Sequence, residues 1–144
     1  MPFSYGRTIR FAETDAAGVV YFANCLCLCH EAYEAALAEA GVNLKLFFSS
    51  GAIAVPIVHA EVDFYQPLFC GDRVEVGLTP QALDQSSFVV SYQIWRGDEG
   101  IERDRPLAQA LTRHVCIDRT SRRRRPLTAE LQQWLAQFSA AGRD

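Results

Sequence analysis

An acidic residue precedes a predicted helix by a few positions, and this pair of features could carry out acyl-transfer chemistry. Asp15 lies in "TDAAGVV", and apolar or small residues then recur at helical spacing from Phe22 to Ala40. The first N–H groups of a helix lack intrahelical partners and carry partial positive charge, so they can hold a carbonyl oxygen that becomes negative. A carboxylate beside that carbonyl carbon could attack it or deprotonate a water that does.

The same acid has a purely structural interpretation. Asp next to Ala-Ala-Gly is a common turn former, because its side chain can cap nearby backbone N–H groups. Gly18 would let the backbone turn tightly, and it would also let a substrate approach. The residues alone therefore leave Asp15 open between a turn residue and a catalytic acid.

Composition and charge exclude several classes of protein. The 144 residues, 49% hydrophobic and 22% charged, predict one domain over residues 1–144. No apolar run approaches the roughly 20 residues that cross a bilayer, and "MPFSYGRTIRF" does not resemble an export signal. The net charge of −3 gives no general electrostatic basis for binding nucleic acid. We expect a cytoplasmic protein with neither a membrane nor a nucleic-acid partner.

The sequence has five cysteines, which is an odd number, and it shows no export signal. Both observations indicate reduced thiols that pack as small hydrophobic residues. Three of them fall in "CLCLCH", which superficially suggests a metal site. On a helix Cys25 and Cys29 share a face while Cys27 points largely away, so three thiolates would not converge on one ion. We therefore expect no bound metal.

The order of predicted elements is strand, long helix, four strands and short helix, which favours an α+β fold with a mainly antiparallel sheet against the helix. Gly41 would end the long helix, and Thr128 would cap the short one. The strands alternate apolar and polar residues, which predicts that one face of each is buried. The expected elements are a strand at 5–13, a helix at 22–40, strands at 58–65, 73–78, 87–95 and 107–117, and a helix starting near 128; residues 42–51 and 96–106 are expected to be connectors.

Three segments of the chain resemble a known family. "TDAAGVVYFANCLCLCHEAYEAAL", "VPIVHAEVDFYQPLFCGDRVEV" and "LTRHVCIDR" are similar to the hotdog-fold acyl-CoA thioesterases of the 4-hydroxybenzoyl-CoA thioesterase family. The pattern D-x-x-G-V-V-Y-F-x-N is specific for this family, and the similarity runs from about residue 4 to residue 118. "CHEAYE", "PIVHAEVDF" and "RHVCI" are most similar to members that hydrolyse 1,4-dihydroxy-2-naphthoyl-CoA in phylloquinone biosynthesis.

The resemblance implies a hotdog fold, in which an antiparallel sheet wraps around a long central helix. The family's catalytic carboxylate falls on Asp15, as nucleophile or general base, and its thioester-polarising N–H falls on Phe22. An acyl-CoA is the implied partner, and no cofactor is implied because water, a carboxylate and backbone dipoles suffice. Relatives form dimers that pair into tetramers with sites at subunit interfaces, so a homo-oligomer is expected. The candidate substrate-binding residues are Gly18, Tyr21, His59 and Phe64.

The histidines have competing interpretations. Many relatives carry an acid fifteen positions after the catalytic Asp, where this chain has His30, which we expect to be structural or solvated. His59 shares a strand face with Glu61, so it is either a surface charge partner or, by resemblance, a pocket residue. The same two interpretations hold for His114 beside Arg113. Aromatic residues such as Tyr21 could wall an acyl group, although such residues usually belong to the core.

Several other functions remain as alternatives. The thioesterase could act on 4-hydroxybenzoyl-CoA or short acyl-CoAs, or the chain could bind acyl-CoA without catalysis. Hotdog hydratases pair Asp with a His five positions on, where this chain has Val20, which argues against hydration. The run "RRRR" at 122–125 is best explained as a solvated connector, then as a contact for CoA phosphates, and last as a nucleic-acid contact.

Overall fold

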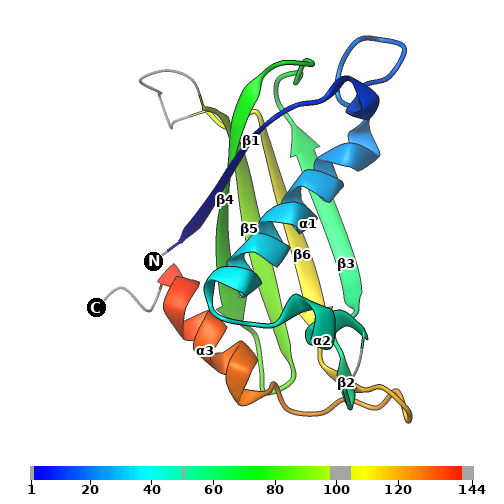
Figure 1. Ribbon diagram of the computed structural model, residues 1–144, viewed down its shortest axis with the longest axis vertical. Coiled ribbons are helices and arrows are strands. Elements are labelled where there is room, and N and C mark those ends of the chain that lie inside the picture. Colours follow the sequence, from blue (N-terminus) through cyan, green and yellow to red (C-terminus); the bar gives the residue numbers. More distant parts are fainter. Residues whose placement is uncertain (1, 50, 98–104, 141–144) are drawn as a thin grey trace.

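The computed structural model describes residues 2–49, 51–97 and 105–140. The fold is built on one main sheet and two longer helices (Figure 1). The elements in chain order are β1 (Phe3–Thr8), a 3-10 helix η1 (Phe11–Glu13), α1 (Phe22–Glu39), α2 (Leu44–Ser49), β2 (Ile53–Ala54), β3 (Ile57–Phe64), β4 (Arg73–Ala82), β5 (Ser87–Arg96), β6 (Ala108–Val115), β7 (Ile117–Asp118) and α3 (Ala129–Phe138).

The five long strands form one antiparallel sheet in the order β1-β4-β5-β6-β3, and β2 pairs separately with β7. Helix α1 lies across one face of this sheet, as Figure 1 shows. The α+β prediction, with an antiparallel sheet around a long helix, is confirmed. The predicted inward faces of β4 and β5 are also confirmed, because all of these residues are buried: Val74, Val76, Leu78, Phe88, Val90, Tyr92 and Ile94.

Helix α1 forms the centre of the core. Its alanine-rich sequence favours a helix and leaves little bulk, so the sheet can approach closely. The helix ends as predicted before Gly41, which has φ +88°. Cys25 and Cys29 are buried and Cys27 is exposed, as the predicted helical face requires. The expectation that all five cysteines pack as small hydrophobic residues is wrong for Cys27 and Cys70, which are exposed. Phe22 is 60% exposed, so it does not belong to the buried face.

Helix α3 covers the lower part of the core beside β4 (Figure 1). Its predicted N-cap is confirmed, because the Thr128 hydroxyl accepts a 3.2 Å hydrogen bond from the Leu131 N–H. The predicted apolar face is confirmed as well, since Leu127, Leu131, Trp134, Leu135 and Phe138 are all buried. The ring of Phe138 contacts Phe3 of β1 edge to face, with the centroids 5.4 Å apart.

Four predicted boundaries are wrong. Strand β4 continues beyond its expected end at Leu78 to Ala82. The first strand ends at Thr8, because the Ile9 N–H bonds to the Asp72 carbonyl and the chain then turns into η1. The connector at 42–51 contains α2, whose first turn is supported by a bond from the Leu46 N–H to the Asn43 side chain. The predicted strand at 107–117 breaks at Cys116, beyond which β7 leaves the sheet to pair with β2.

Two expectations remain, one for the connector before β6 and one for membrane-spanning helices. The connector at 96–106 falls largely outside the described residues. Within the ranges that the structure describes, no helix is long and apolar enough to span a membrane.

Candidate active site

The loop that carries Asp15 is folded by its own backbone. The Asp15 N–H donates to the Val19 carbonyl at 2.9 Å, and the Gly18 N–H donates to the Asp15 carbonyl at 3.0 Å. Gly18 has φ +83°, a left-handed conformation that glycine adopts without steric cost. The Asp15 carboxylate accepts a 2.8 Å hydrogen bond from the Ala17 N–H, so the turn-forming interpretation is confirmed. The side chain is exposed, so this bond leaves the carboxylate accessible from outside.

The N-terminus of α1 follows directly and presents uncapped N–H groups. Phe22 is the first helical residue, and the preceding Tyr21 supplies no side-chain cap. The Phe22 N–H therefore has no acceptor within the helix and can donate to a ligand, at the positive end of the helix dipole. The Tyr21 N–H is itself bound to the Glu13 carbonyl at 2.9 Å, which fixes the direction in which the chain enters the helix.

A cleft of about 390 Å³ brings these groups together with the end of β3. Four predicted site residues line it, and its full lining is Asp15, Val19, Val20, Tyr21, Phe22, Phe64, Tyr65, Gln66, Pro67 and Leu68. Tyr21, Phe22 and Phe64 are 46%, 60% and 48% exposed, so these aromatic side chains are not part of the core. The cleft thus combines one carboxylate, one free helix N-terminus and four aromatic side chains, because Tyr65 lines it as well.

Two predicted substrate-binding residues do not line this cleft. Gly18 shapes the loop without facing the cleft. His59 lies near the opposite end of β3 from Phe64, and its Nε2 is 2.9 Å from Oε1 of Glu61, as its surface interpretation predicts.

His30 also behaves as expected. Its Nδ1 pairs with Glu34 at 3.4 Å, and its ring contacts Tyr33 of α1 and Phe48 of α2.

The surface interpretation of His114 is wrong. Its side chain is completely buried and stacks on Phe88, with the ring centroids 4.7 Å apart. Nε2 lies 2.8 Å from the Thr112 hydroxyl, and burial lowers the pKa of His114 to about 4. His114 faces α1 because β6 alternates, which places its neighbour Arg113 on the outer face.

Sequence reasoning missed the segment "YQPL", which forms one wall of the cleft. Tyr65, Gln66 and Pro67 follow β3 directly, and the Leu68 carbonyl accepts a 2.8 Å bond from the Val20 N–H. A proline just beyond a strand is a turn signal, and a turn next to the predicted Phe64 could have been placed at the site.

The arginine run forms the exposed connector between β7 and α3, as predicted. Arg124 pairs with Asp84 at 3.6 Å and Arg125 pairs with Asp118 at 3.7 Å. Arg122 and Arg124 line a depression together with Arg113, separate from the cleft at Asp15. Across the described part of the chain, no three His, Cys, Asp or Glu side chains are grouped so that they could hold a metal ion.

Comparison with known proteins agrees with this architecture. The model of the thioesterase-like superfamily matches residues 9–135, and the chain belongs to this family. A 1,4-dihydroxy-2-naphthoyl-CoA hydrolase of Crocosphaera subtropica is 52% identical over 132 residues, which cover 92% of this chain and 94% of the relative. A protein of the same name from Gloeothece citriformis is 50% identical over 94% of this chain and 92% of its own length.

Among solved structures, a 1,4-dihydroxy-2-naphthoyl-CoA thioesterase from Synechocystis superposes with a TM-score of 0.87. It is 39% identical in sequence, and the match covers 96% of this chain and 98% of that chain. The hotdog fold expected from the resemblance is thereby confirmed.

Proposed function

We propose that the protein hydrolyses the thioester of 1,4-dihydroxy-2-naphthoyl-CoA to 1,4-dihydroxy-2-naphthoate and CoA, a step of phylloquinone (vitamin K1) biosynthesis. The observation that carries the proposal is that Asp15 and the free N-terminus of α1 line one cleft. The relatives named for this activity, at about half identity over most of the chain, support the choice of substrate.

In this proposal the thioester carbonyl oxygen accepts a hydrogen bond from the Phe22 N–H, which stabilises the negative charge of the tetrahedral intermediate. Asp15 acts by one of two routes. As a nucleophile it attacks the carbonyl carbon, CoA leaves as the thiolate, and water then hydrolyses the resulting anhydride. As a general base it removes a proton from the water that attacks. Both routes use water and the groups of this chain alone, so the proposal includes no cofactor.

The cleft supplies the binding surface for the acyl group. We assign Tyr21 and Phe64 to the faces of the naphthoyl ring, because aromatic pairs contribute beyond their buried area. Gly18 lets the loop keep the carboxylate at the mouth of the cleft. His59 lies outside the cleft of its own chain, so in this proposal it reaches substrate only across a subunit interface.

The proposal includes a homo-oligomer, a dimer of dimers, in the cytoplasm. Strand β3 is an edge of the sheet, and unpaired edge strands are ready to pair with another chain. Ile57 and Val58 on this strand are 41% and 53% exposed. The edge therefore presents apolar side chains to solvent, and exposed apolar patches often mark interaction sites. A second strand there would complete the sheet around a single domain of residues 1–144.

The test is the release of free CoA, measured by chromatography because five cysteines would react with a thiol dye. The substrates are 1,4-dihydroxy-2-naphthoyl-CoA, 4-hydroxybenzoyl-CoA and a short acyl-CoA, each with wild type, Asp15→Asn and the control Asp63→Asn on β3. We expect the naphthoyl thioester to give the highest kcat/KM. Asp15→Asn should lose about a thousandfold or more in kcat, since it removes the reacting carboxylate while Asn can keep the turn.

The outcomes separate the candidate functions. Preference for 4-hydroxybenzoyl-CoA or the short ester would replace the substrate but keep the reaction. Binding of the thioesters without turnover would point to a non-catalytic acyl-CoA module. Full activity in Asp15→Asn would reduce Asp15 to a turn residue and refute the mechanism.

The two routes for Asp15 are distinguished by isotope. Repeated turnover in heavy-oxygen water would place label in the Asp15 carboxylate if an anhydride forms. Label found in the product alone would assign the general-base route.

A further inference from the structure

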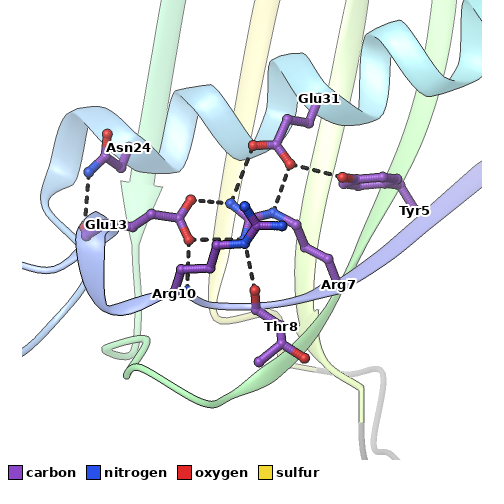
Figure 2. A network of polar contacts seen from close by, with 7 residues as sticks. All are labelled: Tyr5, Arg7, Thr8, Arg10, Glu13, Asn24 and Glu31. Carbon is purple, nitrogen blue, oxygen red and sulfur yellow. Dashed lines mark hydrogen bonds and ion pairs between the residues drawn. The ribbon is translucent and has the colours of Figure 1, made fainter.

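A charged network joins three elements of the fold (Figure 2). Its centre is Arg7 on β1, whose side chain is only 13% exposed. Nε of Arg7 lies 2.7 Å from Oε1 of Glu31 in the middle of α1, and Nη1 donates a 2.9 Å bond to Oε1 of Glu13 in η1. Tyr5 adds a 2.9 Å bond from its hydroxyl to Glu31. One guanidinium group therefore connects the first strand, the 3-10 helix and the central helix.

Glu13 links this network to the start of α1. Its carboxylate accepts the Arg10 N–H at 2.8 Å in addition to Arg7. Its main-chain carbonyl accepts both the Tyr21 N–H at 2.9 Å and the Asn24 side-chain amide at 2.9 Å. Glu13 thus holds the residue before Phe22 and the first turn of α1, and it stands two positions before Asp15.

The charges of this network reinforce one another. Partial burial would raise the pKa of Glu13, but the hydrogen bonds from Arg7 and from the Arg10 N–H outweigh burial, and its pKa is lowered. Burial likewise opposes the charge of Arg7, while the bonds to Glu13 and Glu31 raise its pKa. Glu13 and Arg7 therefore face each other as ions at neutral pH.

We infer that Arg7 and Glu13 are positioning residues for thioester hydrolysis, which hold the Asp15 loop and the Phe22 N–H at the separation that the reaction requires. The inference rests on the proposed function. A reacting group displaced by about 1 Å can lose roughly a hundredfold in rate, so a rigid link between the two segments has direct kinetic value.

A purely stabilising role explains the arrangement less well. Desolvation largely offsets the attraction of a half-buried ion pair, so replacing such pairs by apolar residues is often neutral or stabilising. Here the carboxylate of Glu13 holds the Arg10 N–H shortly before the Asp15 loop, and its carbonyl holds the Tyr21 N–H and the Asn24 side-chain amide at the start of α1. Charged groups placed in this way specify geometry more than they add free energy of folding.

The test compares Glu13→Gln with the control Arg96→Gln. Glu13→Gln keeps the size of the side chain and removes the charge that faces Arg7. Arg96→Gln breaks another 2.7 Å ion pair, between the end of β5 and Asp72 in the turn before β4. For each protein kcat and KM for the preferred acyl-CoA and the melting temperature are measured, with kinetics recorded well below that temperature.

We expect Glu13→Gln to lower kcat about tenfold to a hundredfold with KM within about twofold, because ground-state binding is kept while the reacting groups move apart. Arg96→Gln should keep kcat. Asn24→Ala, which removes one of the two bonds to the Glu13 carbonyl, should also lower kcat. It tests the inference if Glu13→Gln does not fold.

Unchanged kcat in Glu13→Gln and Asn24→Ala would overturn the inference and leave the proposed function intact. The inference would also be overturned if kcat fell equally in Glu13→Gln and Arg96→Gln and followed the fall in melting temperature. The network would then act through stability alone. If wild type hydrolyses none of the acyl-CoA thioesters, both the inference and the proposed function fall.

Discussion

Asp15 and Phe22 line the same cleft because the loop between them folds back on itself, with the Asp15 N–H bound to the Val19 carbonyl at 2.9 Å. Among the described residues of this lining, Asp15 is the only carboxylate. In the proposed reaction, the acid-base or nucleophilic role therefore falls to the Asp15 side chain, and stabilisation of the oxyanion falls to the Phe22 N–H.

Replacing Gly18 by Ala should cost both stability and activity. Gly18 has φ +83°, where a Cβ costs roughly 1–2 kcal/mol, although nothing lies within 4 Å of the added atom. Gly41→Ala is the matched control, since Gly41 has φ +88° and equally open surroundings at the far end of α1. Urea unfolding should show a similar loss for both variants, whereas CoA release should fall only in Gly18→Ala. Equal turnover in the two variants would argue that the loop shape is irrelevant to catalysis.

Truncating Phe64 should change substrate preference. Phe64→Ala removes one aromatic wall of the cleft, and losing about 1–2 kcal/mol of apolar contact raises KM for an aromatic acyl-CoA roughly tenfold. KM for acetyl-CoA, which lacks a ring, should change about twofold or less. Phe48→Ala is the control, because Phe48 on α2 is similarly exposed and lies outside the cleft. An equal rise in KM for both thioesters would remove Phe64 from the acyl-binding wall.

A charge on the edge strand β3 should weaken self-association. Val58 is 53% exposed there, and a charged side chain on an edge disfavours pairing with another strand. We expect sedimentation equilibrium to give a multiple of the 16.1 kDa chain for wild type and a shift toward one chain for Val58→Lys. Leu83→Lys adds the same charge at a similarly exposed position between β4 and β5 and should keep the wild-type mass. Wild type sedimenting as a single chain would refute the proposed oligomer.

The buried His114 should make the protein sensitive to mild acid. Burial, and secondarily the charge of His30, lowers the pKa of His114 from 6.5 to about 4. Below pH 6.5 the unfolded chain binds a proton that the folded chain does not, so the free energy of unfolding falls as the pH drops from 6.5 toward 4. The total loss approaches about 3 kcal/mol.

Urea titrations at pH 7.5, 6 and 5 measure this loss. His114→Gln should be less stable than wild type at pH 7.5, because it loses the stacking on Phe88, but its stability should fall less between pH 7.5 and 5. His59→Gln, at an exposed site, should keep the wild-type slope. A wild-type slope in His114→Gln would assign the acid sensitivity to other groups.

The sequence predicted the sheet and the two main helices because their signals are local. Each of these signals depends on residues that are close in sequence: the alternation in β4 and β5, the Thr128 cap and the glycine after α1. The predicted meeting of Asp15, Tyr21, Phe22 and Phe64 came from the family resemblance, since periodicity alone could not bring the end of β3 to the start of α1.

Long-range contacts account for what sequence reasoning missed. The end of β1 at Thr8 depends on the bond from Ile9 to Asp72, far along the chain. The period-two pattern placed His114 opposite Arg113, but which of the two faces the helix is decided by the position of the sheet against α1. The Arg7 network was not foreseen either, because nothing local relates Arg7 to Glu31.

The contact between Phe3 and Phe138 couples the first strand to the last helix. Helix α3 contributes Leu131, Trp134, Leu135 and Phe138 to the same cluster of buried residues as α1 and the sheet. During synthesis on the ribosome, the core therefore stays open until the α3 segment has emerged. A nascent chain that lacks this segment leaves Tyr33 and Phe88, the aromatic partners of Trp134, uncovered on that side. We therefore expect the core to close late in synthesis, and a chain truncated before Ala129 to leave part of its apolar interior exposed.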